Sequence, residues 1–232
     1  MVKLTIIIPV YNEIKTIEKL LNKIISLDIK KQIIVVDDGS RDGTRLILKK
    51  FNKKIDKLIF HKENYGKGAA IKSAQKFVNG KFVGIQDADL EYNPKDLIKI
   101  YNHIKKNKLK VVYGSRVLNK NKYQNTKNFT HLIRIWGNIF LTIVSNIINN
   151  QNLTDAHTCY KMFETKIFKK INLKEKGFAF CPEVTTKLSK KNYKIIEIPI
   201  SYKGRTYDKG KKITSIDGLV ALICLIKYRL ID

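Results

Sequence analysis

Three acidic residues at alternate positions are the pattern in this sequence that most directly suggests chemistry. Asp87, Asp89 and Glu91 follow the short apolar run 81–85. In extended backbone, alternate side chains point to the same side, so the three carboxylates can face one point in space. A hard divalent cation such as Mg²⁺ or Mn²⁺ would offset their mutual repulsion and leave coordination positions open for diphosphate oxygens. The alternative is a solvated acidic turn that binds nothing.

The elements that must position these acids alternate between strand and helix patterns. Continuous aliphatic runs are typical of strands buried on both faces, and the segments between them have helical periodicity. Predicted strands cover 4–10, 32–36, 57–60, 81–85 and 111–113, and predicted helices cover 13–27, 44–51, 66–78 and a segment that begins at Pro94. This order predicts an α/β fold with a mostly parallel, doubly wound sheet, in which ligands bind at the carboxyl ends of the strands.

Two further loops at predicted strand ends carry candidate ligand-binding groups. Asp37 and Asp38 follow the second predicted strand, where a carboxylate can accept hydrogen bonds from a ribose hydroxyl or a base N–H. As part of a helix-capping turn they would need no ligand. Lys67 lies in the segment 66–69, Gly-Lys-Gly-Ala, where backbone N–H groups at a helix N-terminus suit a phosphate. The same segment could instead be a packing turn.

Charge and cysteine content narrow the class of protein. The 232 residues carry a formal net charge of +26, from 46 Lys and Arg against 20 Asp and Glu, which predicts attraction to a polyanion. Anionic lipid and phosphorylated substrates qualify, whereas no specific nucleic-acid partner is expected because no zinc finger, basic zipper or aromatic RNA-binding motif is present. The three widely spaced cysteines indicate a reducing compartment. Without a secretory signal or an apolar run of roughly 20 residues, we expect a cytoplasmic location.

Five motifs follow one another along the chain: Ile8-Pro9-Val10-Tyr11-Asn12-Glu13, Val35-Val36-Asp37-Asp38-Gly39-Ser40 with Asp42-Gly43-Thr44, Gly66-Lys67-Gly68-Ala69, Asp87-Ala88-Asp89-Leu90, and Gly114-Ser115-Arg116. Their order resembles that in glycosyltransferase family 2. Over nearly its whole length the chain resembles this family, and within it the polyprenyl-phosphate (dolichyl-phosphate) mannose and glucose synthases. The resemblance implies a GT-A type fold in a single domain, 1–232, with a nucleotide-sugar half, 1–116, and an acceptor half, 117–232.

The resemblance also implies a role for each site residue. The nucleoside-diphosphate sugar, of the GDP-mannose or UDP-glucose type, would contact Pro9, Tyr11, Glu13, Asp37, Asp38, Lys67 and Asp87. Mg²⁺ or Mn²⁺ would bind Asp87, Asp89 and Glu91, although many family members carry Gln in place of this glutamate. Asp89, Arg116 and Arg205 would form the catalytic group. The acceptor would contact Arg134, Asn138, Asp155, Glu183 and Lys212.

The nature of the acceptor decides whether the reaction needs a base. A phosphate monoester is already ionised near neutral pH, so the metal ion and the arginines would suffice, and a single in-line displacement would invert the anomeric configuration. A sugar hydroxyl would need a carboxylate base, for which Asp155 and Glu183 are the candidates. A transferase that extends a soluble or surface glycan, and a non-catalytic nucleotide- or polyanion-binding module, are therefore the alternative functions.

Two apolar segments in the second half suggest contact with a membrane. Segments 129–148 and 216–231 have few charges and could lie as amphipathic helices in the bilayer interface, with Trp136 and Tyr228 near the headgroups. Alternatively they pack on the sheet or against another subunit. We expect a peripheral enzyme on the cytosolic membrane face, with an anionic membrane surface, and a membrane-anchoring subunit or a homodimer, as partners.

Overall fold

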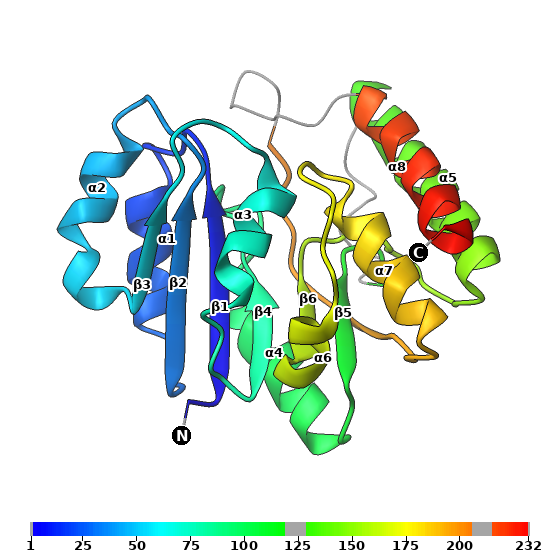
Figure 1. The fold of residues 1–232 in the computed structure, drawn as a ribbon, viewed down its shortest axis with the longest axis horizontal. Coiled ribbons are helices and arrows are strands. Elements are labelled where there is room, and N and C mark those ends of the chain that lie inside the picture. The colour runs from blue at the N-terminus through cyan, green and yellow to red at the C-terminus, as the bar shows by residue number, and fades with distance from the viewer. Residues whose placement is uncertain (1, 119–128, 206–214, 232) are drawn as a thin grey trace.

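One central sheet runs through the computed structural model, which describes residues 2–118, 129–205 and 215–231 (Figure 1). The side chains of 129–134 and of residue 215 lie outside this description. The sheet contains β1 (Leu4–Val10), β2 (Lys31–Asp37), β3 (Lys57–Phe60), β4 (Phe82–Ile85), β5 (Val111–Ser115), β6 (Lys161–Glu164) and β7 (Ile196–Pro199). Their order is β3-β2-β1-β4-β6-β5-β7. All neighbouring strands pair in parallel except β6, which is antiparallel to both β4 and β5.

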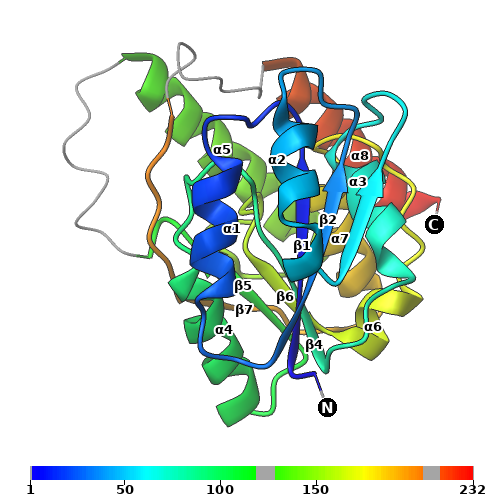
Figure 2. The same ribbon diagram turned by 90° about the vertical axis from the view of Figure 1, so that its left-hand side faces the viewer.

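Helices cover both faces of this sheet. They are α1 (Ile17–Ile25), α2 (Thr44–Lys50), α3 (Lys67–Gln75), α4 (Lys95–Lys106), α5 (Phe129–Asn149), α6 (Thr165–Lys170), α7 (Phe180–Lys190) and α8 (Ser215–Leu230), with a short 3₁₀ turn, η1 (Asn52–Lys54). Figure 2 shows α1 and α4 on one side of the sheet and α3 and α6 on the other. None of the described helices is long and apolar enough to cross a membrane.

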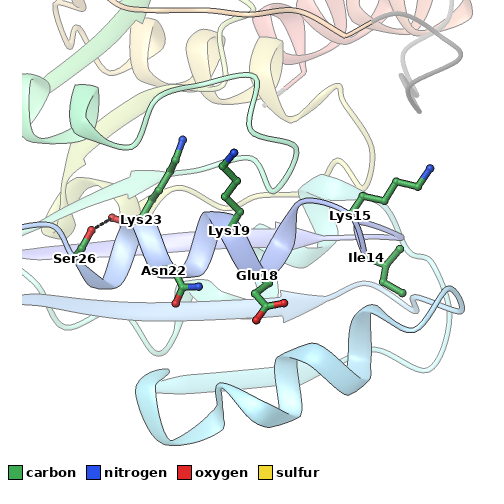
Figure 3. Close-up of a pocket in the computed structure, with 7 residues that line it drawn as sticks. All are labelled: Ile14, Lys15, Glu18, Lys19, Asn22, Lys23 and Ser26. Atoms are coloured by element: carbon green, nitrogen blue, oxygen red, sulfur yellow. Dashed lines mark hydrogen bonds between the residues drawn. The ribbon is translucent and has the colours of Figure 1, made fainter.

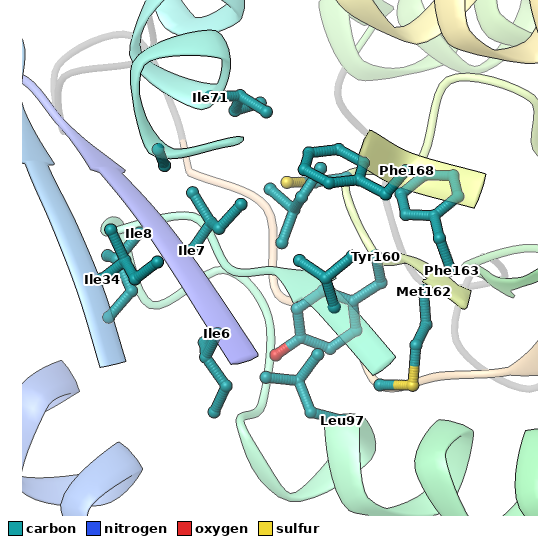
Figure 4. Close-up of a cluster of buried hydrophobic side chains, with 14 of the residues drawn as sticks. Ile6, Ile7, Ile8, Ile34, Ile71, Leu97, Tyr160, Met162, Phe163 and Phe168 are labelled. Atoms are coloured by element: carbon teal, nitrogen blue, oxygen red, sulfur yellow. The ribbon is translucent and has the colours of Figure 1, made fainter. Parts of the chain in front are cut away.

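Strand β1, which lies inside the sheet between β2 and β4, shows why the apolar runs in this sequence are continuous. Ile6 and Ile7 are fully buried, and Figure 4 shows them pointing to opposite faces of the sheet, with Ile7 on the side of Ile71. Since helices cover both faces, every position of the strand is removed from water. The predicted α/β fold with a mostly parallel sheet is thus confirmed, and all five strands predicted in the first half are present.

The second half contributes two strands that the sequence patterns did not predict. β6 inserts between β4 and β5, and β7 lies beyond β5, so residues from both halves of the chain form one sheet. β6 has only four residues, and Lys161, which begins it, is fully buried. Its ammonium group donates to the Ala156 carbonyl at 2.7 Å and lies 3.6 Å from the centre of the Tyr113 ring. Because β6 begins with this buried lysine, its residues do not form an apolar run, and a search for apolar periodicity does not find the strand.

Helix α8 packs along α7 and buries one of the two aromatic residues predicted to lie near lipid headgroups. Tyr228 is 1% exposed, clusters with Ala179 and Cys224, and donates its hydroxyl to Glu175 at 2.7 Å. The predicted position of Tyr228 near the lipid headgroups was therefore wrong, because Tyr228 lies on the side of α8 that packs against the rest of the protein. Cys224 and the other two cysteines are buried free thiols.

Candidate active site

The carboxyl ends of the parallel strands bring together groups that are far apart in the sequence. Glu13 follows β1, Asp37 ends β2, Asp89 lies in the loop after β4, and Arg116 follows β5. Arg205, beyond β7, reaches back across the sheet to the first and third of these loops. The convergence predicted for this edge of the sheet is therefore present.

Arg205 is surrounded by three acids. Its guanidinium donates to both carboxylate oxygens of Glu13, at 3.1 and 3.0 Å, and to Asp89 Oδ2 at 3.2 Å. Its backbone N–H donates to Glu91 Oε1 at 2.7 Å. Burial, followed by the charges of Asp87 and Glu91, raises the pKa of Asp89 to about 7, although Arg205 acts in the opposite direction. The single positive charge of Arg205 therefore offsets only part of the negative charge of the acids around it.

The three acids reach this site through a turn, which corrects one expectation. Residues 88–91 are not extended, and Leu90 has a left-handed φ of 61°. The Glu91 backbone N–H donates to Asp89 Oδ1 at 3.1 Å, an interaction that stabilises a turn after an aspartate. The acids are close together because the chain turns, and not because alternate residues of a strand point one way.

Glu91 is engaged differently from the two aspartates. Its second carboxylate oxygen, Oε2, accepts a 2.6 Å hydrogen bond from the Tyr202 hydroxyl, while Oε1 accepts the backbone N–H of Arg205. Both oxygens therefore bind the segment 202–205. Glu91 fixes that segment beside the acids and lies 3.6 Å from Arg205 Nε, whereas Asp87 and Asp89 make closer ion pairs with Lys67 and Arg205.

Lys67 is the cation that neutralises Asp87. Its ammonium lies 2.6 Å from Asp87 Oδ1 and 3.1 Å from the Cys159 sulfur. Burial alone would lower the pKa of Lys67, but the nearby Asp87 carboxylate outweighs it and raises the pKa. Lys67 thus holds a positive charge at the metal-binding edge predicted from the sequence.

The glycines on either side of Lys67 serve packing. A Cβ at Gly68 would lie 2.2 Å from the Glu175 carbonyl oxygen, so only glycine allows this close approach. The backbone N–H groups of Gly68 and Ala69 donate to the carbonyls of Gly177 and Lys176, at 3.2 and 3.0 Å. The start of α3 is therefore a packing turn, the second of the two interpretations of this segment.

Asp37 and Asp38 have distinct surroundings. Asp37 Oδ2 accepts from Arg45 Nε at 2.6 Å, but its other oxygen is buried and has no hydrogen-bond partner among the described residues. Asp38 accepts from the backbone N–H groups of Tyr65 and Gly66 and contacts His61 Nδ1 at 2.7 Å. Asp38 therefore holds the loop after β3, whereas Asp37 retains an acceptor for a ligand N–H or O–H.

Arg116, directly after β5, forms a bidentate ion pair with Asp155. Its Nε and Nη2 donate to the two oxygens of Asp155, at 2.6 and 2.7 Å, and Asn138 Nδ2 donates to the same carboxylate at 3.2 Å. The Tyr202 ring lies 5.1 Å from the guanidinium carbon. Three residues predicted from the sequence, Arg116, Asn138 and Asp155, therefore meet in one network.

The two carboxylates predicted as bases are both engaged in strong contacts. Burial would raise the pKa of Asp155, but the Arg116 guanidinium outweighs it and lowers the pKa. Glu183 is fully buried and accepts from the Lys187 ammonium at 2.8 Å and from the backbone N–H groups of Lys174 and Glu175. Glu183 thus fixes residues 174 and 175, and the lowered pKa of Asp155 makes that side chain a poor proton acceptor at neutral pH.

The remaining predicted site residues are placed less completely. Pro9 is buried within β1, and Tyr11 is half-buried directly after it. Arg134 lies in helix α5, but its side chain is outside the described residues, as is the whole of Lys212.

A surface groove along α1 contains none of the predicted site residues. Figure 3 shows Lys15 and Lys19 extending from it to the same side, as a solvated basic helix face does.

Several residues that hold the site were not predicted. Arg45 and His61 orient the two aspartates after β2, and Tyr202 binds Glu91. Glu197 accepts the backbone N–H of Asp155 at 2.9 Å. None of them lies within the motifs, and His61, Tyr202 and Glu197 each act through a contact with a distant segment. Only the spacing of Asp37 and Arg45, on a strand and the helix after it, offered a local signal.

Among the described residues, no group of three or more His, Cys, Asp and Glu side chains is arranged to hold a metal ion. The oxygen donors of Asp87 and Asp89 nevertheless suit Mg²⁺ or Mn²⁺, and the raised pKa of Asp89 shows that more positive charge would be accommodated. The residues therefore fit a metal site with two carboxylate ligands, in which diphosphate oxygens and water would complete the coordination.

Comparison with known proteins identifies the family of this chain. The family model described as Glycosyl transferase family 2 matches residues 5–172. A dolichyl-phosphate beta-glucosyltransferase of Trichomonas vaginalis is 28% identical over 218 residues, covering 87% of this chain and 66% of that protein. A UDP-N-acetylglucosamine–dolichyl-phosphate N-acetylglucosaminyltransferase of Methanococcus voltae is 28% identical over 214 residues, covering 84% and 83%.

Solved structures show the same fold at low sequence identity. Glucosyl-3-phosphoglycerate synthase from Mycobacterium tuberculosis, in complex with Mn²⁺, uridine diphosphate and glucosyl-3-phosphoglycerate, superposes with a TM-score of 0.69 at 12% identity and covers 99% of this chain and 81% of that one. TarS from S. aureus, in complex with UDP-GlcNAc, gives 0.62 at 18% identity, covering 97% and 66%. The expected GT-A type fold is thereby confirmed.

Proposed function

This chain belongs to glycosyltransferase family 2, and we propose that it transfers a hexose from a nucleoside-diphosphate sugar to a polyprenyl phosphate, with inversion at the anomeric carbon. The chain is a glycosyltransferase; the donor, the acceptor, the metal ion and the stereochemistry are the proposed parts. Both relatives with named activities act on dolichyl phosphate according to their names, and we carry this acceptor class over to the present chain. The proposed location is the cytosolic face of a membrane.

The donor side is supported by the contacts of the aspartates. Asp37 Oδ1, which has no hydrogen-bond partner in the part of the chain that the structure describes, is a buried acceptor at the end of β2, suited to a ribose hydroxyl or a base N–H. Asp87 and Asp89 would hold Mg²⁺ or Mn²⁺, which when bound acts as a Lewis acid on the departing diphosphate. Lys67 and Arg205 now pair with these acids, and their cationic groups would turn to the diphosphate oxygens of a bound donor.

The acceptor side rests on one observation: Asp155, which a hydroxyl acceptor would need as a base, is bound in a fork by Arg116 and has a lowered pKa. A phosphate acceptor needs no base because it is already ionised. It needs cations nearby, which Arg116 supplies from a fixed orientation, since Asp155 and Asn138 hold it in place. Attack of the phosphate oxygen on the anomeric carbon, opposite the leaving diphosphate, would invert its configuration.

A transfer assay with labelled sugar nucleotides tests the proposal. GDP-mannose, UDP-glucose and related donors would be incubated with Mg²⁺ or Mn²⁺ and with a short polyprenyl phosphate in detergent. The expected result is metal-dependent transfer of label to the lipid, and a β-linked product from an α-linked donor. The matched control acceptor is the same polyprenol without its phosphate, which should accept no sugar.

The other outcomes identify the alternatives. Transfer to soluble oligosaccharides but not to the lipid phosphate would show a glycan-extending transferase. Tight binding of a donor without turnover on any acceptor would show a nucleotide-binding module. Thermal stabilisation by each donor, measured first, selects the sugar nucleotide to be labelled, because a ligand that binds only the folded state raises the melting temperature.

A further inference from the structure

Tyr202 contacts both groups of charged residues in the candidate active site. Its hydroxyl donates to Glu91 Oε2 at 2.6 Å, in the turn that carries the acids. The centre of its ring lies 5.1 Å from the guanidinium carbon of Arg116, which also pairs with Asp155. Glu91 belongs to the proposed donor side of the site, and Arg116 belongs to the proposed acceptor side. One side chain therefore connects the two sides.

The position of Tyr202 is fixed by the backbone and by the groups packed around its ring. Residues 92 and 202 form an antiparallel bridge, and the Lys203 backbone N–H donates to the Glu91 carbonyl at 2.8 Å. The Tyr92 and Tyr202 ring centres lie 5.1 Å apart. A Cβ at Gly204 would lie 3.2 Å from Tyr202 Cε1, so the chain passes close to the ring where it has no side chain. These contacts hold the ring and its hydroxyl in one orientation.

The two contacts of Tyr202 differ in kind and can be separated. The bond to Glu91 is a hydrogen bond to a charged group, which is about twice as strong as one between neutral groups. Burial raises the pKa of Tyr202, although the charge of Arg116 acts in the opposite direction, so the hydroxyl stays protonated and able to donate. The contact with Arg116 is a cation–π interaction, which needs the aromatic ring and not the hydroxyl. Tyr202→Phe would therefore keep the second contact and lose the first.

We propose that Tyr202 is a positioning residue that orients both sides of the site for transfer. Its hydroxyl orients Arg205 through Glu91, because the other carboxylate oxygen of Glu91 accepts the Arg205 backbone N–H at 2.7 Å. Its ring holds Arg116 in addition to the Asp155 carboxylate, which binds the Nε and Nη2 groups of that guanidinium. This role rests on the proposed function, in which Arg205 acts on the departing diphosphate and Arg116 on the acceptor phosphate.

Hydrolysis of the sugar nucleotide without any acceptor tests the hydroxyl. In this reaction water replaces the nucleoside diphosphate at the anomeric carbon, so the leaving group must be stabilised but no acceptor is needed at Arg116. Loss of one hydrogen bond to a charged group predicts a fall in kcat of at least about tenfold, equal for Tyr202→Phe and Tyr202→Leu. Tyr101→Phe, which removes a tyrosine hydroxyl on α4 outside the site, is the control and should keep the wild-type rate.

Transfer to a short polyprenyl phosphate tests the ring. Tyr202→Phe should leave the KM for this acceptor unchanged, whereas Tyr202→Leu should raise it at least about threefold, as expected for the loss of one cation–π contact. The Nε–H proton of Arg116, identified in NMR spectra by its absence from Arg116→Lys, gives a readout that needs no reaction. The ring current of residue 202 should shift this signal in wild type and in Tyr202→Phe, and the shift should be lost in Tyr202→Leu.

Three results would overturn this role. Wild-type hydrolysis by Tyr202→Phe would show that the hydroxyl does not orient Arg205. An equal rise in acceptor KM for Tyr202→Phe and Tyr202→Leu, or an unchanged Arg116 signal in Tyr202→Leu, would show that the ring does not hold Arg116. Circular dichroism and melting curves would establish that each variant folds.

Failure of the proposed function has a different signature. A wild-type protein that transfers no sugar to the lipid phosphate would contradict the proposed acceptor. The hydrolysis rates and the Arg116 signal would still decide the role of Tyr202, because neither measurement uses that acceptor.

Discussion

The carboxyl group of Asp89 is buried between Asp87 and Glu91 and is paired with one arginine. These surroundings raise its pKa to about 7, so at neutral pH the site accepts either a proton or a metal cation. Asp87 and Asp89, which pair with Lys67 and Arg205, are the proposed metal ligands, whereas both oxygens of Glu91 bind segment 202–205. The roles of the three acids should therefore separate when each is substituted.

Asp89→Ala should abolish metal-dependent donor binding and lower transfer at least about a hundredfold, since the Lewis acid on the leaving group would be lost. Titration of Mn²⁺ in the presence of nucleoside diphosphate, followed by electron paramagnetic resonance, measures the binding. Asp28→Ala, an exposed aspartate after α1, is the control. Retention of full metal affinity by Asp89→Ala would remove its proposed role.

Glu91→Gln should reduce Mn²⁺ affinity less than Asp87→Asn does. The substituted amide still offers one oxygen to the Tyr202 hydroxyl, whereas Asp87→Asn removes a proposed ligand charge and should cost at least about tenfold in affinity. The same Mn²⁺ titration measures both variants. Equal losses would show that Glu91 is a metal ligand, as first expected from the spacing of the three acids.

His157 should contribute to loss of stability in acid. Burial, followed by the charge of Lys161, lowers its pKa to about 4 from 6.5, and its Nε2 is buried without a hydrogen-bond partner among the described residues. The unfolded state binds a proton at His157 more readily than the folded state does. The stability that follows from burying His157 in its neutral form is therefore fully present above pH 6.5 and is lost as the pH falls toward 4.

The difference in unfolding free energy between pH 7 and pH 5, measured with urea, should consequently be smaller for His157→Gln than for wild type. His103→Gln, on the surface of α4, should keep the wild-type difference. If His157→Gln kept it too, protonation of His157 would not be coupled to unfolding.

At the scale of elements, the start of α3 depends on its contact with segment 175–177. Gly68→Ala places a Cβ against the Glu175 carbonyl and should destabilise the fold by about 1–3 kcal/mol. Gly177→Ala is a control in the same contact, because a Cβ there meets nothing within 4 Å. Urea unfolding midpoints would compare the two variants. Equal midpoints would mean that segment 175–177 moves away at little cost.

The elements of the first half were predictable because their positions in the fold follow a simple rule. A strand covered by helices on both faces is buried at every position and almost wholly apolar, as β1 is apart from Thr5. A helix on one face repeats its apolar residues, as α1 does with Ile17, Leu20, Leu21 and Ile24. β6 breaks the rule because it begins with Lys161, whose charge is satisfied by a carbonyl and an aromatic ring that only the folded chain provides.

The sequence predicted which residues belong to the site better than it predicted which of them contact one another. The motifs contain Asp89 and Arg116, and the family resemblance implied Arg205. Neither predicted that Arg205 binds Glu13 across 192 residues or that Asp155 holds Arg116 in a fork. Such pairs have no signature in local spacing. The turn at Leu90 was missed for a similar reason, because alternate acids fit an extended strand equally well.

At the scale of the whole molecule, the net charge of +26 should make stability depend on salt. Mutual repulsion of the basic side chains opposes the compact state, and salt at about 0.15 M screens charges more than roughly 8 Å apart. The melting temperature should rise between low salt and this concentration. Differential scanning fluorimetry in NaCl and in KCl would measure it. Similar rises in the two salts indicate screening, whereas a fall would show that ion pairs such as Lys67–Asp87 outweigh the repulsion.

The position of β6 has a consequence for synthesis on the ribosome. β4 and β5 are translated before β6, so neither can form its pairing with β6 until residues 161–164 leave the ribosome. Glu13 likewise cannot bind Arg205 until residue 205 has been translated. A nascent chain released before that point would expose two unpaired strand edges and an incomplete set of charges. Termination of translation before Arg205 should therefore yield a chain that lacks the Arg205–Glu13 ion pair and has no transfer activity.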